Sequence, residues 1–281
     1  MNDKLFGLIG FPLKHSFSLM IHRTAYELLG MEYDYNLFEL RPGRLDHFVT
    51  NLPEKLSGFN ITFPFKEDIY SYLTDCDEIV QIIKCCNTVL IKDTQFYGYN
   101  TDVNGISYTC GKLCKKEKIK RVLIFGAGGA AKAAAYTLAT QFNVKEFHIL
   151  SRLPVPRPGF GFIRESEISF YPFDYRERRE IVGKCDLVIN CTPLGMFPNN
   201  STSPVNDIKE LHPGQHIFDM VYNPAETKLM QQAKIAGATA VNGLEMLIVQ
   251  AAEAFKIFTG REMPINEVHN RVIPEISKRT R

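Results

Sequence analysis

The fold of this chain is decided by the stretch Lys120-Arg-Val-Leu-Ile-Phe-Gly126-Ala-Gly128-Gly129-Ala-Ala131-Lys132. The β-branched and apolar run 121–125 has the length of a strand, and the alanine-rich run 130–139 favours a helix. Between them, the pattern G-x-G-x-x-A combines a glycine for a tight turn, a glycine that lets the backbone approach a pyrophosphate and a small alanine for close helix packing. A strand, this turn and a helix in succession predict a dinucleotide-binding unit whose helix N-terminus holds the phosphates.

Residues 1–119 come before this unit and have to serve another purpose. A chain of 281 residues is long enough for two domains with separate cores, and 45% hydrophobic with 23% charged residues is ordinary for a globular protein. We find neither an apolar run of transmembrane length nor a signal peptide, so we expect a cytoplasmic protein that does not bind membranes. Seven cysteines without repeated C-x-x-C spacing favour reduced thiols over disulfides.

The charge pattern and the metal-ligating residue types argue against two further classes of function. The net charge of +2 is small, and the basic run 112–121 lacks interleaved aromatic side chains, so we predict no nucleic-acid binding. His212 and His216 have helical spacing, but the Pro-Gly pair between them breaks a helix. Cys110 and Cys114 lack a second ligand pair, and we therefore predict no metal site.

The first part of the chain mixes strand and helix patterns. Ser16 is a candidate N-cap and Gly30 a stop signal for a helix over 16–29, whereas Pro42 suits the first position of a short helix. Alternation and β-branched residues predict strands at 4–10, 33–40, 58–63, 87–91 and 96–99, the last two as a hairpin. This part is therefore of the α/β class.

The second part alternates strands and helices in the manner of a parallel sheet with covering helices. Pro274 is expected to end the last helix, and both helices beyond Gly243 could return to pack on the first domain. The run 152–161, rich in proline and glycine, is expected to be an irregular loop. We predict strands at 121–125, 146–150, 187–190, 216–220 and 239–241, and helices at 130–139, from 225, at 245–258 and at 265–272.

Paired hydroxyl groups stand at the start of the first predicted helix. Ser16 and Ser18 follow a strand end, where backbone N–H groups without helical partners and side-chain hydroxyls together can bind a carboxylate. Simple helix capping is the alternative interpretation of each serine.

A lysine and an aspartate offer a pair for proton transfer. Strand alternation sends Asn60 and Thr62 to one side, and Pro64 turns the chain so that Lys66 follows at the strand end. Lys66 is either a proton donor or an ordinary solvated lysine. Asp102 either caps the next helix or partners Lys66, giving a coupled pair that moves a proton.

A series of short motifs spans the chain, and in this order they resemble the shikimate dehydrogenase family along nearly the whole length. The glycine-rich turn described above is one of them. The motifs are Gly10-Phe-Pro-Leu-Lys-His-Ser16-Phe-Ser18, Asn60-Ile-Thr-Phe-Pro-Phe-Lys66, Asn87-Thr, Asn100-Thr-Asp102, Gly126-Ala-Gly-Gly-Ala, Asn190-Cys-Thr192-Pro-Leu-Gly195-Met196, Asp219-Met-Val-Tyr222-Asn-Pro224 and Asn242-Gly243-Leu-Glu-Met-Leu-Ile-Val-Gln250.

The resemblance implies a role for residues at each motif. Lys66 matches the family's catalytic lysine, and Asp102 matches its partner. The implied substrate-binding residues are Ser16, Ser18, Asn60, Thr62, Lys66, Asn87, Asp102, Tyr222 and Gln250. The implied cofactor-binding residues are Gly126, Ala127, Gly128, Gly129, Ala130, Ser151, Arg152, Thr192, Met220 and Gly243.

Two positions depart from the family pattern. Leu19 stands where the family usually has proline, but both serine hydroxyls before it remain. At the end of the second strand of the nucleotide unit, members that use NADP commonly show Asn-Arg-Thr, and this chain has Ser151-Arg152-Leu153. An acidic residue there would favour the ribose hydroxyl of NAD, whereas Arg152 favours the 2′-phosphate of NADP, so we expect NADP.

The expected protein is an α/β reductase with an N-terminal α/β substrate domain, 1–104, and a Rossmann-type doubly wound parallel-sheet domain, 105–242. C-terminal helices, 243–281, are expected to return to the first domain. The resemblance implies NADP-dependent interconversion of 3-dehydroshikimate and shikimate, a step of aromatic amino acid biosynthesis. A quinate/shikimate dehydrogenase, a folate-linked dehydrogenase and a non-catalytic nucleotide-binding regulator are the alternatives. The sequence leaves the choice between monomer and homodimer open.

Overall fold

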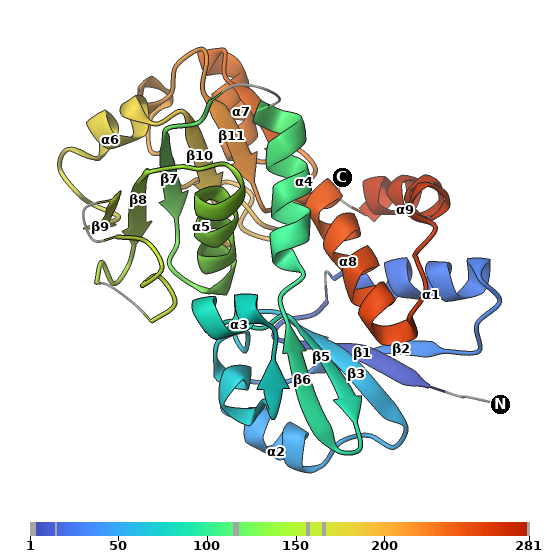
Figure 1. The fold of residues 1–281 in the computed structure, drawn as a ribbon. Helices are drawn as coiled ribbons and strands as arrows, with labels where there is room; N and C mark the ends of the chain where they lie inside the picture. The colour runs from blue at the N-terminus through green and yellow to red at the C-terminus, as the bar shows by residue number, and fades with distance from the viewer. Residues whose placement is uncertain (1–3, 15, 115–117, 156–157, 165–166, 280–281) are drawn as a thin grey trace. The chain divides into compact units, whose positions relative to one another are not determined.

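The computed structural model describes residues 4–14, 16–114, 118–155, 158–164 and 167–279. The chain forms two compact units, one of Met1–Asn104 with Leu247–Arg279 and the other of Gly105–Met246. Each unit is built on its own sheet, which has six strands among the described residues (Figure 1). Residues 243–246, which the sequence analysis grouped with the C-terminal helices, cluster with the second unit.

The first unit contains a mixed sheet in the order β2-β1-β3-β5-β6-β4. In it, β1 (Leu5–Gly10) runs parallel to β2 (Asp34–Glu39) and to β3 (Leu56–Ile61). β5 (Thr88–Lys92) is antiparallel to β3 and forms the predicted hairpin with β6 (Gln95–Tyr99). The short β4 (Asp75–Cys76), which the sequence did not indicate, lies at the edge beside β6. The five predicted strands are confirmed.

Helices cover this sheet, and they come from both ends of the chain (Figure 1). From the N-terminal part come α1 (Ser18–Leu28), α2 (Leu45–Thr50), the 3₁₀ helix η1 (Asp68–Tyr72) and α3 (Glu78–Ile83). From the C-terminal part come α8 (Leu244–Thr259) and α9 (Ile265–Arg279). Most of α8 and all of α9 belong to the first unit, as the sequence predicted.

Aromatic packing holds α8 on the first sheet. The ring of Phe258 stacks on Phe6 of β1 with centroids 4.7 Å apart. Gly58 of β3 makes room for this ring, because a Cβ there would lie 2.9 Å from Phe258 Cε1. Phe255 is fully buried, and the centroid of its ring lies 5.4 Å from that of Tyr26 of α1. These contacts give α8 a large apolar interface with the first unit.

The opposite face of the sheet has its own aromatic cluster. The rings of Phe48 and Phe59 meet edge to face at 5.5 Å, and Phe59 meets Phe96 in the same way at 5.9 Å. This cluster packs α2 against β3 and β6, so both faces of the sheet are covered.

Three helix boundaries that the sequence indicated for the first unit are wrong. α1 begins at Ser18, with Phe17 at the N-cap position and no side-chain cap, while the hydroxyl of Ser16 accepts the Ser18 N–H at 3.3 Å. Pro42 lies in a turn before α2, because the chain reverses at Gly43 (φ 82°) before the helix starts. Pro274 lies inside α9, where burial of Ile276 on the helix's apolar face continues beyond the proline and offsets its missing hydrogen bond.

The second unit contains a parallel sheet in the order β12-β11-β10-β7-β8-β9. When the strands are numbered 1 to 6 along the chain from β7 and the sheet is read from the β9 edge, the order is 3-2-1-4-5-6, which is that of the Rossmann fold. Its strands are β7 (Arg121–Phe125), β8 (Glu146–Ser151), β9 (Ile168–Pro172), β10 (Leu187–Asn190), β11 (His216–Asp219) and β12 (Thr239–Asn242). Its helices are α4 (Asp102–Cys114), which begins in the first unit, α5 (Gly129–Gln141), α6 (Arg178–Lys184), η3 (Ile208–Glu210) and α7 (Lys228–Ala236).

The alanine-rich sequence of α5 allows it to lie close to the sheet. Ala131, Ala133, Ala134 and Ala135 are all fully buried, as are four of the five residues of β7. The sequence predicted this strand, turn and helix, and the structure confirms them. It missed β9 and α6, which follow the irregular run after β8 and have weaker apolar periodicity. The helix predicted from 225 begins only at Lys228, because Thr227 caps its N-terminus.

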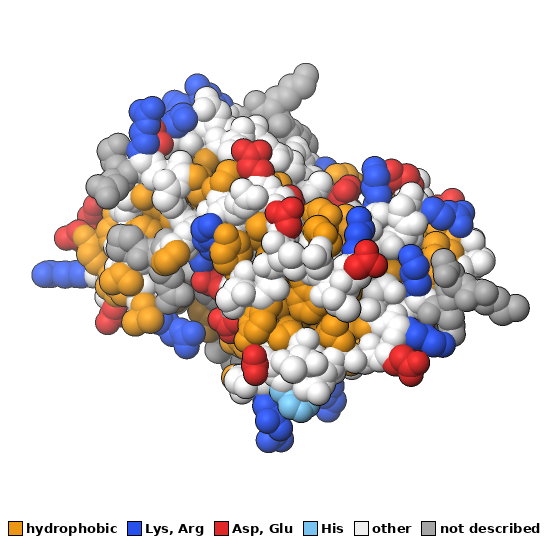
Figure 2. Space-filling model, turned by 60° about the horizontal axis from the view of Figure 1, so that its bottom comes forward, with side chains coloured by type: hydrophobic (Ala, Val, Ile, Leu, Met, Phe, Trp, Pro, Cys, Tyr) orange, Lys and Arg blue, Asp and Glu red, His pale blue; other side chains and the backbone are white. Residues whose placement is uncertain are grey.

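Within the described part of the chain, none of the helices has the length and apolar character to cross a lipid bilayer. The same residues contain no group of three or more His, Cys, Asp or Glu side chains arranged to hold a metal ion. On the face drawn in Figure 2, basic and acidic side chains are interspersed.

The packing of α8 predicts that Phe255→Ala destabilises the protein by about 3–5 kcal/mol, because the change leaves a cavity in the aromatic cluster. Denaturant unfolding measures this loss. Ile235→Ala is the matched control, since Ile235 is 76% exposed and its truncation should change the free energy of unfolding by less than about 0.5 kcal/mol. Equal effects of the two substitutions would contradict the packing described.

Candidate active site

A partly buried ion pair lies near the strand ends of the first unit. Lys66 follows β3 after the turn at Phe63-Pro64, and Asp102 is the first residue of α4, after β6. Lys66 Nζ donates to Asp102 Oδ2 at 2.5 Å, with the two side chains 18% and 5% exposed. An ammonium and a carboxylate held out of bulk water interact strongly, and together they can hold and move a proton.

An amide side chain connects this pair to its surroundings. Asn87 Nδ2 donates to Asp102 Oδ1 at 2.9 Å and lies 3.4 Å from Gln250 Oε1 of α8. The backbone N–H of Thr101 donates to Asn87 Oδ1 at 2.8 Å. The predicted residues Lys66, Asn87, Asp102 and Gln250 are thus brought together from four separate segments.

Asn60 and Thr62 lie near the same edge of the sheet. Asn60 is buried, and its Nδ2 donates to Thr88 Oγ1 at 2.9 Å. The hydroxyl of Tyr35 on β2 donates to Asn60 Oδ1 at 2.7 Å. Thr62 is half-buried, and its N–H continues the ladder by donating to Ile9 O at 2.9 Å. The shared side that strand alternation gives Asn60 and Thr62 stays a prediction.

The serine pair lies on the segment that leaves β1. Ser16 is half-buried and Ser18 buried, at the start of α1. The segment is anchored where the N–H of Leu13 donates to Glu39 Oε2 at 2.8 Å. The sequence analysis did not single out Glu39, because one acidic residue at a strand end carries no distinctive signal.

The glycine-rich turn of the second unit has the geometry that a phosphate site needs. Gly126 has φ 103°, a left-handed conformation that a side chain would strain, and its N–H donates to Leu150 O at 2.8 Å. Gly128, the N-cap of α5, is exposed and makes no side-chain cap. Ala127 is buried, whereas Gly129 and Ala130 are half-buried in the first turn of α5. The first-turn N–H groups and the positive end of the helix dipole together suit a phosphate.

The residues at the end of β8 suit the ribose end of a dinucleotide. Ser151 is buried, and its hydroxyl donates to Leu153 O at 2.8 Å, which shapes the turn. Arg152 is exposed beside it. A guanidinium at this strand end can pair with a 2′-phosphate, whereas an acidic residue would repel it.

A buried carboxylate organises the loops after β10 and β11. Asn190 Nδ2 donates to Asp219 Oδ1 at 2.9 Å, and Thr227 Oγ1 donates to Asp219 Oδ2 at 2.6 Å. Thr192 donates its N–H and its hydroxyl to Asn190 Oδ1, at 3.0 and 2.6 Å. Desolvation raises the pKa of Asp219 from 3.8 to about 6. The sequence motifs contained Asn190 and Asp219, but they gave neither residue a role.

The other predicted residues of the second unit lie around this buried carboxylate. Met220 directly follows Asp219, and its N–H donates to Asn190 O at 3.0 Å. The N–H of buried Gly243 donates to Val221 O at 3.2 Å. Tyr222 is half-buried, and desolvation raises the pKa of its hydroxyl to about 12. Tyr222 belongs to the second unit, so the structure does not group it with the other predicted substrate-binding residues.

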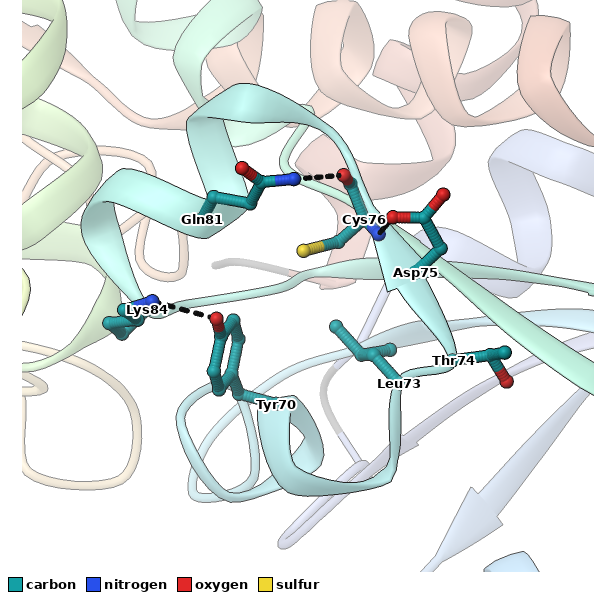
Figure 3. Close-up of a pocket in the computed structure, with 7 residues that line it drawn as sticks. All are labelled: Tyr70, Leu73, Thr74, Asp75, Cys76, Gln81 and Lys84. Carbon is teal, nitrogen blue, oxygen red and sulfur yellow. Dashed lines mark hydrogen bonds between the residues drawn. The ribbon is translucent and has the colours of Figure 1, made fainter.

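A separate hollow of about 350 Å³ lies on the first unit (Figure 3). Its polar groups largely bind one another: Lys84 Nζ donates to the hydroxyl of Tyr70 at 2.7 Å, and Gln81 Nε2 donates to Cys76 O at 3.1 Å. The hollow shares no residue with the predicted site. Its lining is Tyr70, Leu73, Thr74, Asp75, Cys76, Gln81 and Lys84.

Known proteins share these sequence features. A model of the shikimate dehydrogenase substrate binding domain matches residues 8–89, and one of the shikimate 5'-dehydrogenase C-terminal domain matches residues 243–273. The shikimate dehydrogenase (NADP(+)) of Methanocaldococcus jannaschii is 36% identical over 283 residues, which cover 98% of each chain. The chain belongs to the shikimate dehydrogenase family.

Solved structures of the family show the same fold. The shikimate dehydrogenase of Thermus thermophilus in complex with NADP(H) and shikimate is 28% identical, with a TM-score of 0.81 over 99% of this chain and 100% of that chain. A quinate dehydrogenase of Corynebacterium glutamicum in complex with NAD is 27% identical, with a TM-score of 0.83 over 97% of this chain and 99% of that chain. The fold therefore does not distinguish these two substrates, and side chains have to decide.

Because the pKa of Asp219 is raised to about 6, the folded state binds this proton more tightly than the unfolded chain does. The contribution of Asp219 to stability therefore falls as pH rises from about 4 to about 6 and stays low above that range. Asp219→Asn removes the buried charge, and the amide can keep all three hydrogen bonds because the Thr227 hydroxyl can accept as well as donate.

The variant should therefore gain stability relative to the parent as pH rises from 4 to 7, by at most about 3 kcal/mol. Urea unfolding at both pH values measures the difference. Asp174→Asn, at an exposed position, is the control and should show no such trend. A constant difference for Asp219→Asn across this range would show that its burial does not perturb titration.

Proposed function

We propose that this protein is an NADP-dependent shikimate dehydrogenase that interconverts 3-dehydroshikimate and shikimate, a step of aromatic amino acid biosynthesis. The observation that carries the proposal is the partly buried Lys66–Asp102 pair at 2.5 Å, in a chain that belongs to this family. Because both groups of the pair are present and in contact, a catalytic role is favoured over that of a non-catalytic regulator.

The pair suits the proton transfer of this reaction. When the ring ketone is reduced, Lys66 donates a proton from Nζ to the forming alkoxide, and in the reverse direction it accepts the hydroxyl proton. Asp102 Oδ2 accepts a hydrogen bond from the ammonium and fixes its direction. Asn87 and Gln250 lie beside the pair and are assigned to the substrate's ring hydroxyls, with Asn60 and Thr62.

The remaining assigned groups bind the ends of the substrate. Ser16 and Ser18 are assigned to its carboxylate, because hydroxyls at the start of α1 can donate to an anion. Tyr222 is assigned to the same end, and its raised pKa keeps the hydroxyl a neutral donor at physiological pH.

NADP is the expected cofactor, and when bound it supplies the hydride chemistry. The turn Gly126–Ala130 suits its pyrophosphate, and Arg152 suits its 2′-phosphate. Thr192, Met220 and Gly243 are assigned to the cofactor through the loops that the Asp219 carboxylate holds. We assign the substrate domain to 1–104, the nucleotide domain to 105–242 and the C-terminal helices to 243–281.

We place this activity in the cytoplasm. All seven cysteines are free thiols, which supports a reducing compartment. Both a monomer and a homodimer are compatible with the proposal, and sedimentation of the purified protein distinguishes them.

Turnover with shikimate and quinate, each offered NADP and NAD, tests the proposed function. Shikimate with NADP should give the highest kcat/KM, and a clear preference for quinate with NAD would assign the protein to the alternative activity. Absence of turnover with every combination would leave the regulator as the better explanation.

Lys66→Ala should lower kcat by about 10²–10⁴-fold, because it removes the group that transfers the proton. Initial rates at saturating shikimate and NADP measure the loss. Lys256→Ala is the control, since its ion pair with Glu262 is exposed, and its kcat should equal that of the parent. A Lys66→Ala enzyme within a few-fold of the parent would contradict the proton-transfer role.

Arg152→Asp should raise KM for NADP and lower the preference for NADP over NAD, because a carboxylate at the end of β8 repels the 2′-phosphate. The ratio of kcat/KM for the two cofactors measures the preference. An unchanged ratio would show that Arg152 does not select the cofactor.

A further inference from the structure

A continuous series of buried hydrogen bonds leads away from the catalytic pair. Asn87 donates to Asp102 at 2.9 Å, and Asn87 Oδ1 accepts from the Thr88 hydroxyl at 3.0 Å. Thr88 Oγ1 accepts from Asn60 Nδ2 at 2.9 Å, and Asn60 Oδ1 accepts from the Tyr35 hydroxyl at 2.7 Å. All five residues are at least nine-tenths buried, so water does not substitute for these bonds.

The direction of each bond follows from its neighbours. The Asp102 carboxylate can only accept, and the Thr101 backbone N–H can only donate, so the Asn87 amide has one possible orientation. Thr88 must then donate to Asn87 and accept from Asn60. This leaves the Asn60 carbonyl oxygen facing Tyr35, which must donate. Desolvation raises the pKa of Tyr35 well above its ordinary value and keeps its proton in place.

Packing fixes the Tyr35 ring. The His22 ring stacks on it with centroids 4.3 Å apart and an angle of 6° between the planes. Burial lowers the pKa of His22 to about 3, so the stacked imidazole is neutral. The Tyr35 hydroxyl is therefore held by two rigid elements, β2 and α1, rather than by a loop.

These hydrogen bonds leave the side chain of Asn60 with one acceptor position, on Oδ1. Its Nδ2 group donates to Thr88 Oγ1 at 2.9 Å and to Asn87 O at 3.4 Å, which uses both amide hydrogens. Its Oδ1 takes one bond from Tyr35 and has a second lone pair. In this arrangement Asn60 can accept a bond from a hydroxyl but cannot donate one.

We propose that Tyr35 and Thr88 are positioning residues, which hold the Asn60 carbonyl oxygen as an acceptor for a substrate ring hydroxyl and tie it to the Asn87–Asp102–Lys66 group. This inference rests on the proposed function. Neither residue is assigned to substrate, and both act through Asn60 and Asn87.

The kinetic constants of Tyr35→Phe test the hydrogen bond from the Tyr35 hydroxyl to Asn60. The change keeps the ring stacked on His22 but removes the donor to Asn60, so KM for shikimate should rise about threefold to tenfold, the value of one lost hydrogen bond. KM for NADP should stay within twofold of the parent. Tyr26→Phe is the matched control: Tyr26 is similarly buried in the same aromatic cluster, but its hydroxyl has no hydrogen-bond partner among the residues that the structure describes. This control should keep the parent's KM for shikimate and for NADP.

Variants of Thr88 test the hydrogen bonds that join Asn60 to Asn87 through the Thr88 hydroxyl. They also test the inference if Tyr35→Phe does not fold. Thr88→Val keeps the shape of the side chain but removes the hydroxyl. KM for shikimate should therefore rise, and kcat should fall, each by about threefold to tenfold. Thr88→Ser restores the hydroxyl and should return both constants to within about twofold of the parent. A residue that only stabilises the fold would lower the melting temperature without this pattern of loss and rescue.

Exchange of the side-chain amide protons, measured by ¹⁵N NMR, separates this inference from the proposed function. The Asn60 and Asn87 amide protons should exchange slowly in the parent and at least tenfold faster in Thr88→Val. If the parent does not turn over shikimate, the proposed function fails while this measurement still tests the hydrogen bonds. Unchanged exchange in Thr88→Val, an unchanged KM in Tyr35→Phe, or equal losses in Thr88→Val and Thr88→Ser would overturn the inference.

Discussion

The carboxylate of Asp102 is removed from water at the start of α4, and it has to be paired within the protein. An isolated buried charge would cost several kcal/mol or would take up a proton. Lys66 neutralises it from the end of β3, and Asn87 satisfies its second oxygen from the start of β5. This one requirement fixes the relative positions of three strand ends, and it holds in place the ammonium that we propose as the proton donor to the substrate.

The second unit meets a related requirement with different groups. Asp219 is also buried, but three uncharged or backbone donors face it instead of a cation. The pKa of Asp219 rises because these hydrogen bonds only partly compensate for desolvation of the carboxylate. The same type of side chain is therefore paired with a cation in one unit and anchors loops through uncharged donors in the other.

The sequence predicted most strands and the longer helices because their patterns are local. The run 121–125 is apolar after its first residue, contains two β-branched residues and has the length of a strand, and the turn after it needs glycine at a left-handed position. Boundaries that depend on tertiary packing were predicted poorly. Pro274 ended the predicted helix, yet α9 continues because Ile276 remains buried on the helix's apolar face. The sequence of the edge strand β9 has only weak apolar periodicity, and the strand forms through its pairing with β8.

The sequence by itself determined the α/β class, the nucleotide turn and, through motifs that resemble a family, the identity of Lys66, Asp102 and their neighbours. It did not determine which polar groups bind one another, because Tyr35, Asn60 and Thr88 lie 25 and 28 residues apart and have no shared periodicity. Only the tertiary structure decided that, since the order of strands in the sheet places β2, β3 and β5 so that these side chains meet. Burial then leaves these groups only one another as partners, and the direction of the hydrogen bonds follows.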